Sequence, residues 1–319
     1  MTFQFRQAKR SEAKPLIGLY AESGCGKTWS ALLLARGFVG PQGRIGMIET
    51  EGGRGEANVG RDPVGDYLVC PIRGNFSPQA YGEAITAAEG ANLDALIVDS
   101  ASHEWEGAGG VLSMAADNQA NNMKGVLVWQ RPKIEHQRNF MLRLMQTPIP
   151  LVIVCMRAKY PMVEKQKSGG GKEWVRSEEL EPKQADDILF EMFVHGWIDK
   201  AHKLHVTKYT IPEVASVIRD GEPITIESGR ALATWARGGS VAPASALEPA
   251  GAAVTVPTAE RYVEQWRVMI EAATSAQQLG KTWNDQKSLR NKITWPDDGT
   301  FDGLKAQVAT AIENLKAPA

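Results

Sequence analysis

The chain of 319 residues lacks any apolar run near the ~20 residues that a membrane-spanning helix needs. Its first residues, Met1 to Arg6, are polar and contain no apolar segment of the kind found in secretory signals. Cysteine is scarce, because Cys25, Cys70 and Cys155 are odd in number and far apart, which argues against a disulfide framework or a zinc site. These absences predict a cytoplasmic protein with reduced thiols.

An excess of charge of one sign is also absent, because 36 Lys and Arg face 37 Asp and Glu. The chain as a whole therefore does not attract nucleic acid, and any basic surface must be local. The apolar fraction, 43%, is ordinary for a soluble globular protein. At this length we expect a large domain and a smaller one, because single domains rarely grow beyond ~250 to 300 residues.

The most informative segment is the octapeptide Ala21, Glu22, Ser23, Gly24, Cys25, Gly26, Lys27 and Thr28. It matches the phosphate-binding loop (P-loop) pattern G-x-x-x-x-G-K-[ST], with Ala21 in place of the first glycine. Gly24 and Gly26 allow backbone dihedrals at which successive N–H groups surround phosphate oxygens. Lys27 is expected to reach the β and γ phosphates, and the Thr28 hydroxyl to bind Mg²⁺. The octapeptide therefore predicts a site for ATP and Mg²⁺.

The flanks of the octapeptide are those that the motif requires. Residues 15–20 form a short apolar run that predicts a buried strand, and residues 28–36 have the pattern of a helix. A strand, a glycine-rich loop and a helix make up the P-loop unit, and the helix turns its positive dipole end toward the phosphates.

Apolar strands alternate with helical segments after the P-loop, which predicts an α/β fold with a mostly parallel sheet flanked by helices. Strands are predicted at 44–49, 67–72, 93–99 and 150–156, with more exposed strands at 203–208 and 223–226. Helices are predicted at 77–90, 132–146 and 229–237.

The composition then changes. Residues 239–257 are rich in Gly, Ala, Pro, Ser and Val and predict a linker between a domain at 1–238 and a module at 258–319. In that module apolar residues recur at helical spacing in three stretches, around Trp266, around Trp283 and from Phe301 to Leu315. We therefore expect a small C-terminal helical module whose tryptophans pack its core.

Carboxylates complete the predicted site. Asp99 ends an apolar strand and is placed to act as the Walker B carboxylate that shares Mg²⁺ with Thr28. Ser100 follows it, so the Asp-Glu pair of many P-loop ATPases is absent. The expected water-activating base is therefore Glu51, just beyond the second strand and at the same edge of the sheet as the P-loop. Glu104 is the second candidate and Glu49 the third.

These residues carry a family resemblance. Glu22 to Thr28, Met47 to Glu51, Ala95 to Ser100 and Cys155 to Lys159 are similar in order and spacing to the ATPase core of RecA-like recombinases, and most similar to the short RecA-like ATPases of bacteriophages. The resemblance spans residues 3–238. It implies a RecA-like P-loop NTPase fold, catalytic roles for Lys27 and Glu51, and a role for Asp99 as the Walker B aspartate. The glutamine that senses the γ-phosphate in RecA is missing here, and Arg157 or Lys159 is the candidate substitute.

A basic, glycine-rich segment follows the strand at 150–156 and is the candidate contact for single-stranded DNA. Its cations supply charge for phosphates, and Tyr160 and Trp174 offer rings for stacking on bases. The alternative is a solvated hairpin, because Glu164 and Glu173 dilute the charge. A second, weaker candidate is Trp129 to Lys133. The predicted contacts in the main segment are Arg157, Lys159, Lys165, Lys167 and Lys172.

Together these features predict a Mg²⁺-dependent ATPase that acts on single-stranded DNA in phage recombination, annealing or repair, in the cytoplasm of a bacterial host. The resemblance implies a homo-oligomer, as a ring or filament, and phage single-strand binding or recombination proteins as partners. The alternative is a nucleotide-dependent switch or assembly ATPase that binds a protein through the C-terminal module and has no role on DNA. The sequence leaves open which of these functions applies and what the module does.

Overall fold

The computed structural model describes residues 5, 7–10, 13–166, 172–239, 259–271, 275–285, 290–291, 293, 295–296 and 299–315. The chain divides into two units, Met1–Ala246 and Leu247–Ala319, each of which is described by itself. Residues 240–257 of the predicted linker lie outside the described part. In that part, no helix combines the length and the apolar character that crossing a membrane requires.

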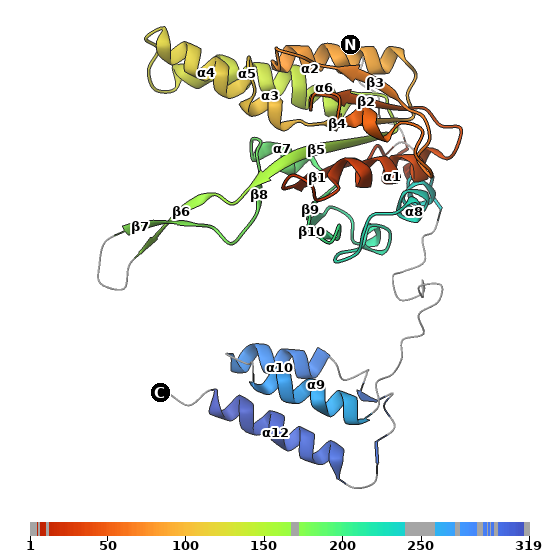
Figure 1. Ribbon diagram of the computed structural model, residues 1–319, viewed down its shortest axis with the longest axis vertical. Helices are drawn as coiled ribbons and strands as arrows, with labels where there is room; N and C mark the ends of the chain where they lie inside the picture. The colour runs from red at the N-terminus through yellow and green to blue at the C-terminus, as the bar shows by residue number, and fades with distance from the viewer. Residues whose placement is uncertain are drawn as a thin grey trace. The chain divides into compact units, whose positions relative to one another are not determined.

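The first unit has the predicted α/β fold, with a mostly parallel sheet in the order β10-β9-β1-β5-β4-β2-β3 (Figure 1). Only β10 and the short β8, which pairs with β5, run antiparallel to their neighbours. The strands of this sheet are β1 (Leu16–Ala21), β2 (Ile45–Glu49), β3 (Leu68–Pro71), β4 (Ala95–Asp99), β5 (Leu151–Lys159), β8 (Glu181–Pro182), β9 (Val194–Ile198) and β10 (Leu204–Tyr209).

Side chains alternate between the two faces of the sheet, so each central strand contributes to two hydrophobic cores. In β1, for example, Ile17 and Leu19 enter one core, and Leu16 and Tyr20 enter the other. Strands β1, β2 and β4 are buried along their whole length. The continuous apolar runs in the sequence reflect this burial on both faces.

Helices cover both faces (Figure 1). Helix α1 (Lys27–Val39) and helix α8 (Ile226–Ala236) close the first core, and α2 (Pro78–Gly90) and α6 (Leu142–Gln146) close the second. Helices α1 and α8 approach closely because Gly229 has no side chain, since a Cβ there would lie 2.2 Å from the Leu34 carbonyl oxygen. The remaining helical segments are η2 (Gly55–Asn58), α3 (Ser102–Glu106), α4 (Val111–Ala120), α5 (Leu127–Glu135), η3 (His136–Met141), α7 (Asp187–Glu191) and η4 (Pro212–Ser216).

The helix predicted at 132–146 differs from the observed one. Helix α5 begins five residues earlier, and Pro132 lies inside it. A proline cannot donate a hydrogen bond to the carbonyl four residues before it. Asn118 on the neighbouring helix fills this gap, because its side-chain amide donates to the Val128 carbonyl oxygen at 2.9 Å. The helix then continues as a π-helical turn, η3, and ends as α6.

One predicted strand is wrong, and one observed strand was missed. The strand predicted at 223–226 is wrong: Thr225 is the N-cap of α8, in a capping box with Ser228, so these residues lead into a helix. Strand β9 was not predicted at all, although it lies between β1 and β10. His195 and Gly196 interrupt its apolar pattern.

The second unit contains α9 (Ala259–Glu271), α10 (Ala276–Asp285) and α12 (Thr300–Asn314), which confirms the predicted helical character of this region. Its core includes Tyr262, Trp266, Leu279, Leu304 and Val308, all of them buried. The ring of Trp283 packs edge-on against that of Trp266, with centroids 4.8 Å apart. The tryptophans thus pack this core, as the spacing predicts.

Candidate nucleotide-binding site

The P-loop joins β1 to α1 at the carboxyl edge of the sheet. Gly24 and Gly26 both take left-handed backbone conformations, with φ of 87° and 83°, and Gly26 caps the start of α1. Only glycine takes these conformations without strain. The loop borders a cavity of about 620 Å³. Its lining consists of residues 21–29, Glu51, Arg54, Asn58, Asp99, Arg157, Ala158 and Lys183, so the nine positions predicted to bind nucleotide, 21–28 and Asp99, all border it.

Lys27, Thr28 and Asp99 meet in this cavity. The Lys27 Nζ atom lies 3.3 Å from Asp99 Oδ1, and the Thr28 hydroxyl donates a hydrogen bond to Asp99 Oδ2. Strand β5 separates β1 from β4, and Cys155 at the centre pairs with Leu19 on one side and Asp99 on the other. The strand order therefore brings together residues that are more than 70 positions apart.

The electrostatics of this cluster favour a charged lysine. Burial is the largest single effect and lowers the pKa of Lys27, but the charge and hydrogen bond of Asp99, together with the charge of Glu51 and other effects, raise the pKa overall. The thiol of Cys155 is fully buried, and this burial raises its pKa well above the ordinary value. Cys155 is therefore a neutral packing residue of the first hydrophobic core.

The donor atoms suit Mg²⁺, which prefers oxygen ligands and is usually held by one or two carboxylates, substrate phosphates and water. The Thr28 hydroxyl and the Asp99 carboxylate are hard oxygen ligands in direct contact. Within the described residues there is no group of three or more His, Cys, Asp or Glu side chains that could hold a metal without a phosphate. These residues therefore fit a Mg²⁺ ion that arrives with a nucleotide.

Glu51 lies on the same cavity and forms a two-point ion pair with Arg157. The Nε and Nη2 atoms of Arg157 donate to the two carboxylate oxygens of Glu51 at 3.0 and 2.9 Å. Burial would raise the pKa of Glu51, but its hydrogen bonds to Arg157 and the charge of that arginine lower it. Glu51 is thus held as a carboxylate at neutral pH. The sequence predicted neither this pair nor the positions of Arg54, Asn58 and Lys183 on the cavity wall.

Glu49, the third candidate for the base, holds the loop that carries Glu51. Its buried carboxylate accepts hydrogen bonds from the backbone N–H groups of Glu51 and Gly53, at 2.7 and 3.0 Å. Arg73 completes the arrangement with an ion pair of 2.6 Å to the same carboxylate. Glu49 therefore has its oxygens occupied by protein donors and positions the backbone of Glu51.

Glu104, the second candidate, is fully buried and does not line the cavity. Its carboxylate bonds to His136 Nδ1 at 2.9 Å and accepts from the Gln184 amide at 3.2 Å. Burial raises the pKa of Glu104. Burial alone would lower the pKa of His136, but the hydrogen bond and charge of Glu104, with a smaller effect of Asp187, raise it overall. The pair connects α3, η3 and the segment after β8, which is a structural role.

The basic segment after β5 forms a hairpin, β6 (Met162–Gln166) and β7 (Lys172–Arg176), that projects from the sheet beyond the end of β5 (Figure 1). Lys167 lies outside the described residues. Lys172 pairs with Glu164 at 2.8 Å, and the Arg176 guanidinium lies 4.6 Å from the centre of the Tyr160 ring. The hairpin is therefore solvated, and Glu164 offsets the charge of Lys172, as the alternative of a solvated hairpin expects. The DNA contact stays a prediction.

The predicted DNA contacts do not share one surface. Lys165 pairs with Glu173 across the hairpin, whereas Trp174 pairs with Glu164 one residue along. Because side chains alternate in a strand, Lys172 and Trp174 lie on one face and Lys165 on the other. Lys159 ends β5 and is exposed, and Arg157 is engaged with Glu51.

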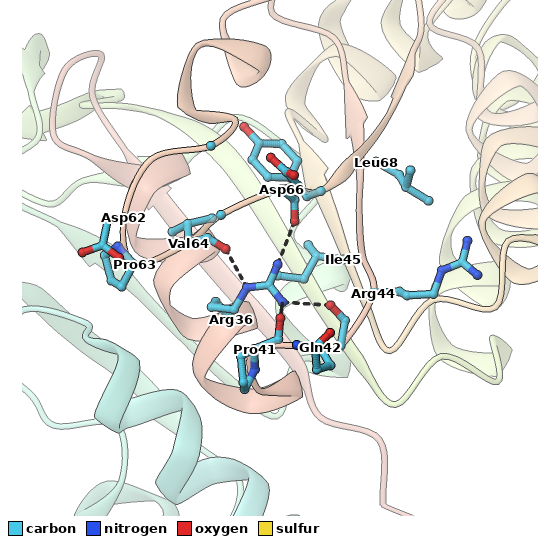
Figure 2. Close-up of a pocket in the computed structure, with 14 residues that line it drawn as sticks. Arg36, Pro41, Gln42, Arg44, Ile45, Asp62, Pro63, Val64, Asp66 and Leu68 are labelled. Atoms are coloured by element: carbon cyan, nitrogen blue, oxygen red, sulfur yellow. Dashed lines mark hydrogen bonds between the residues drawn. The ribbon is translucent and has the colours of Figure 1, made fainter.

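A second cavity, of about 590 Å³, lies at the amino end of β2 and has a different character (Figure 2). Figure 2 shows the Arg36 guanidinium surrounded by backbone carbonyl groups. It donates to the carbonyl oxygens of Val64, Gly40, Gly43 and Asp66 at 2.6 to 2.9 Å. Arg36 thus ties the end of α1 to the 64–66 segment, and its donors are occupied.

Comparisons with known proteins found no matching family model and no matching curated protein. Among solved structures, the chain is similar to a KaiC-like protein from the hyperthermophilic archaeon Pyrococcus horikoshii. The two are 12% identical, the match covers 61% of this chain and 79% of the other, and the TM-score is 0.35. The α/β assignment depends on the strand order and the two cores described above.

Proposed function

We propose that this protein binds ATP with Mg²⁺ and hydrolyses it. The observation that carries the proposal is the direct contact of Lys27 and Thr28 with Asp99 on a cavity that Glu51 also lines. Left-handed glycines, a helix amino end, the Lys27 ammonium group and a hard-oxygen pair form the surface proposed for a triphosphate. Glu51, paired with Arg157 on the same cavity, is the carboxylate that would act on water once Arg157 moves away.

The proposed roles follow from the contacts. Lys27 binds the β and γ phosphates, and Thr28 and Asp99 hold Mg²⁺, which would neutralise charge on the phosphates. Glu51 accepts the proton of the attacking water as that water bonds to the γ-phosphorus and ADP leaves. Glu49 keeps the Glu51 backbone in place. Glu51 lines the cavity, whereas Glu49 and Glu104 do not, and this placement supports the choice of Glu51 as the base.

We further propose that the protein acts on single-stranded DNA through the β6–β7 hairpin. Lys172 and Arg176 supply cations beside Trp174, whose side chain is 67% exposed and available for stacking. Strand β5 continues from Arg157, the partner of Glu51, directly toward this hairpin. DNA that attracts Arg157 would therefore free Glu51 and speed hydrolysis. The setting in phage recombination, annealing or repair, and assembly into a ring or filament, are predictions that rest on the resemblance to RecA-like ATPases.

The test is the rate of ATP hydrolysis with and without single-stranded DNA, together with DNA binding at several salt concentrations. We expect hydrolysis that requires Mg²⁺, stimulation by DNA, and DNA affinity that falls steeply with salt. Mg²⁺-dependent hydrolysis without any effect of DNA would support the proposed ATPase activity and reject the role on DNA. The absence of nucleotide binding would reject both.

The second candidate function is a nucleotide-dependent switch with a protein partner. The observation that favours it is a set of exposed apolar side chains around helices α4 and α5, where Val126 is 83% and Leu127 is 56% exposed. Surfaces of this kind are typical of protein contacts. This candidate predicts slow hydrolysis that DNA does not change, so the same measurement separates the two functions.

A further inference from the structure

We propose that His202, a residue far from the P-loop in sequence, is a positioning residue for the phosphates: its imidazole fixes the peptide between Cys25 and Gly26 so that the Gly26 N–H points into the loop. This inference rests on the proposed nucleotide binding and deepens it. The P-loop pattern itself contains no histidine, and nothing in the sequence around His202 indicates such a role.

The sheet brings His202 to the loop. Strand β9 runs parallel to β1 and pairs with it from Ile17 to Tyr20, so the turn that follows β9 lies beside the loop that follows β1. Asp199 builds this turn, because its carboxylate accepts the Lys203 N–H at 2.9 Å and contacts His205 Nε2 at 2.9 Å. These hydrogen bonds, that of His205 first, lower the pKa of Asp199. The turn thus depends on an ionised aspartate.

The contact itself is direct. His202 Nδ1 lies 2.9 Å from the Cys25 carbonyl oxygen. A carbonyl can only accept, so Nδ1 carries the proton and donates. A Cβ built on Gly26 would lie 2.7 Å from the same nitrogen, so the imidazole packs against the loop backbone. His202 has a φ of 63°, a left-handed conformation that costs some backbone energy in a residue other than glycine.

The consequence follows from the planarity of the peptide bond. In a trans peptide the C=O of one residue and the N–H of the next point in opposite directions. A Cys25 carbonyl turned toward His202 therefore turns the Gly26 N–H away from it, to the concave side of the loop. This N–H belongs to the nest of donors that a P-loop offers to phosphate. His202 pre-orients that donor, which reduces the ordering that nucleotide binding would otherwise require.

Apart from this contact, the His202 side chain is exposed, so it is not a packing residue of a hydrophobic core. Removing an exposed ring creates no cavity in either hydrophobic core, so the loss should affect ligand binding more than stability. The Gly26 N–H is expected to bind phosphate equally before and during the reaction. Losing its fixed orientation should therefore raise KM and leave kcat nearly unchanged.

The experiment uses the full chain and a fluorescent ADP with Mg²⁺ as the probe. His202→Gly deletes the ring and accommodates the positive φ, and His202→Asn keeps a side-chain donor on a residue that tolerates this conformation. Lys203→Ala is the matched control in the same turn. We expect the dissociation constant of His202→Gly to rise about five- to tenfold, as for one hydrogen bond. His202→Asn should recover most of the affinity, and Lys203→Ala should bind like the wild type.

Two outcomes of the binding experiment would overturn the proposal for His202 alone. In the first, the wild type and His202→Gly bind the probe equally tightly. In the second, His202→Gly loses affinity together with a large fall in Tm, and His202→Asn does not recover the affinity. A fall in kcat with KM unchanged would also contradict it. Wild-type protein that binds no nucleotide would instead overturn the proposed function on which the inference rests.

Discussion

The edge of the sheet that carries the P-loop and the hairpin that extends from β5 differ in how firmly their functional side chains are held. At the edge, the side chains of Lys27 and Asp99 are 13% and 3% exposed and contact each other directly. On the hairpin, Trp174 is 67% exposed. The first region is supported by two hydrophobic cores, and the second by a pairing of two strands, which is marginally stable when isolated.

This difference teaches what each region can do. Groups that act on a reacting phosphate need fixed positions, and the buried edge supplies them. A surface that follows a flexible single strand gains from adaptable, exposed rings and cations. Arg157 lies where the two meet, since it lines the cavity beside the P-loop and also belongs to the strand that leads to the hairpin.

The largest expected effect is at the buried edge. Lys27→Ala should weaken ATP binding by about 100-fold or more, because it removes a charged donor to the phosphates from a partly desolvated site. Binding of fluorescent ATP measured by titration checks this, with Lys133→Ala on the exposed face of α5 as the control. Near-normal binding by Lys27→Ala would show that the cavity is not the triphosphate site.

The next largest effect is on stability, at the buried pair of Glu104 and His136. Glu104→Ala should lower the free energy of unfolding by about 3 kcal/mol, because it leaves His136 buried without its partner, while ATP affinity measured in folded protein stays close to that of the wild type. Urea unfolding checks the first part. Glu106→Ala is the matched control, because Glu106 is two residues away and makes a more exposed ion pair with Lys183. Loss of hydrolysis at unchanged stability would instead place Glu104 in the chemistry.

A smaller effect is expected on the hairpin. Trp174→Ala should reduce affinity for single-stranded DNA roughly tenfold, as for the loss of one stacked base, and should leave basal ATP hydrolysis unchanged. Lys165→Gln, on the opposite face, is the control and should reduce the affinity less than Lys172→Gln does. Equal losses for both lysines, measured by fluorescence anisotropy, would show that the DNA does not distinguish the two faces.

The smallest effect concerns the link between the two regions. The pKa of Glu51 is lowered in the folded state, so its stabilising contribution is present above the unfolded pKa of about 4.3 and is lost as the pH falls through the folded value. Since the Arg157 side chain is 41% exposed, the pair should contribute less than about 1 kcal/mol. Arg157→Gln should therefore be slightly less stable at pH 7, and this deficit should shrink only as the pH falls below about 4, toward the lowered pKa of Glu51. A deficit that does not change with pH would point to packing by Arg157 instead.

The sequence predicted the local parts of this molecule well. The P-loop, its flanking strand and helix, and the strand that ends at Asp99 follow from residue patterns a few positions long. The approach of Asp99 to the P-loop was expected from the motif, but the pair of Glu51 and Arg157 was beyond reach, because these residues are 106 positions apart and only the position of β5 brings them together. His202 is a similar case, because its role depends on β9, whose pattern His195 and Gly196 obscure. Thr225 shows the opposite failure, since an alternating stretch that resembles a strand is the cap of a helix.

Glu51→Gln tests the central claim most directly, because it keeps the shape of the side chain and removes the carboxylate. The measurement is ATP binding and ATP turnover on the same preparation, with Glu104→Gln as the comparison. We predict that Glu51→Gln binds ATP like the wild type and hydrolyses it about 100- to 10,000-fold more slowly. Hydrolysis at the wild-type rate by Glu51→Gln would contradict the account and would remove Glu51 as the base.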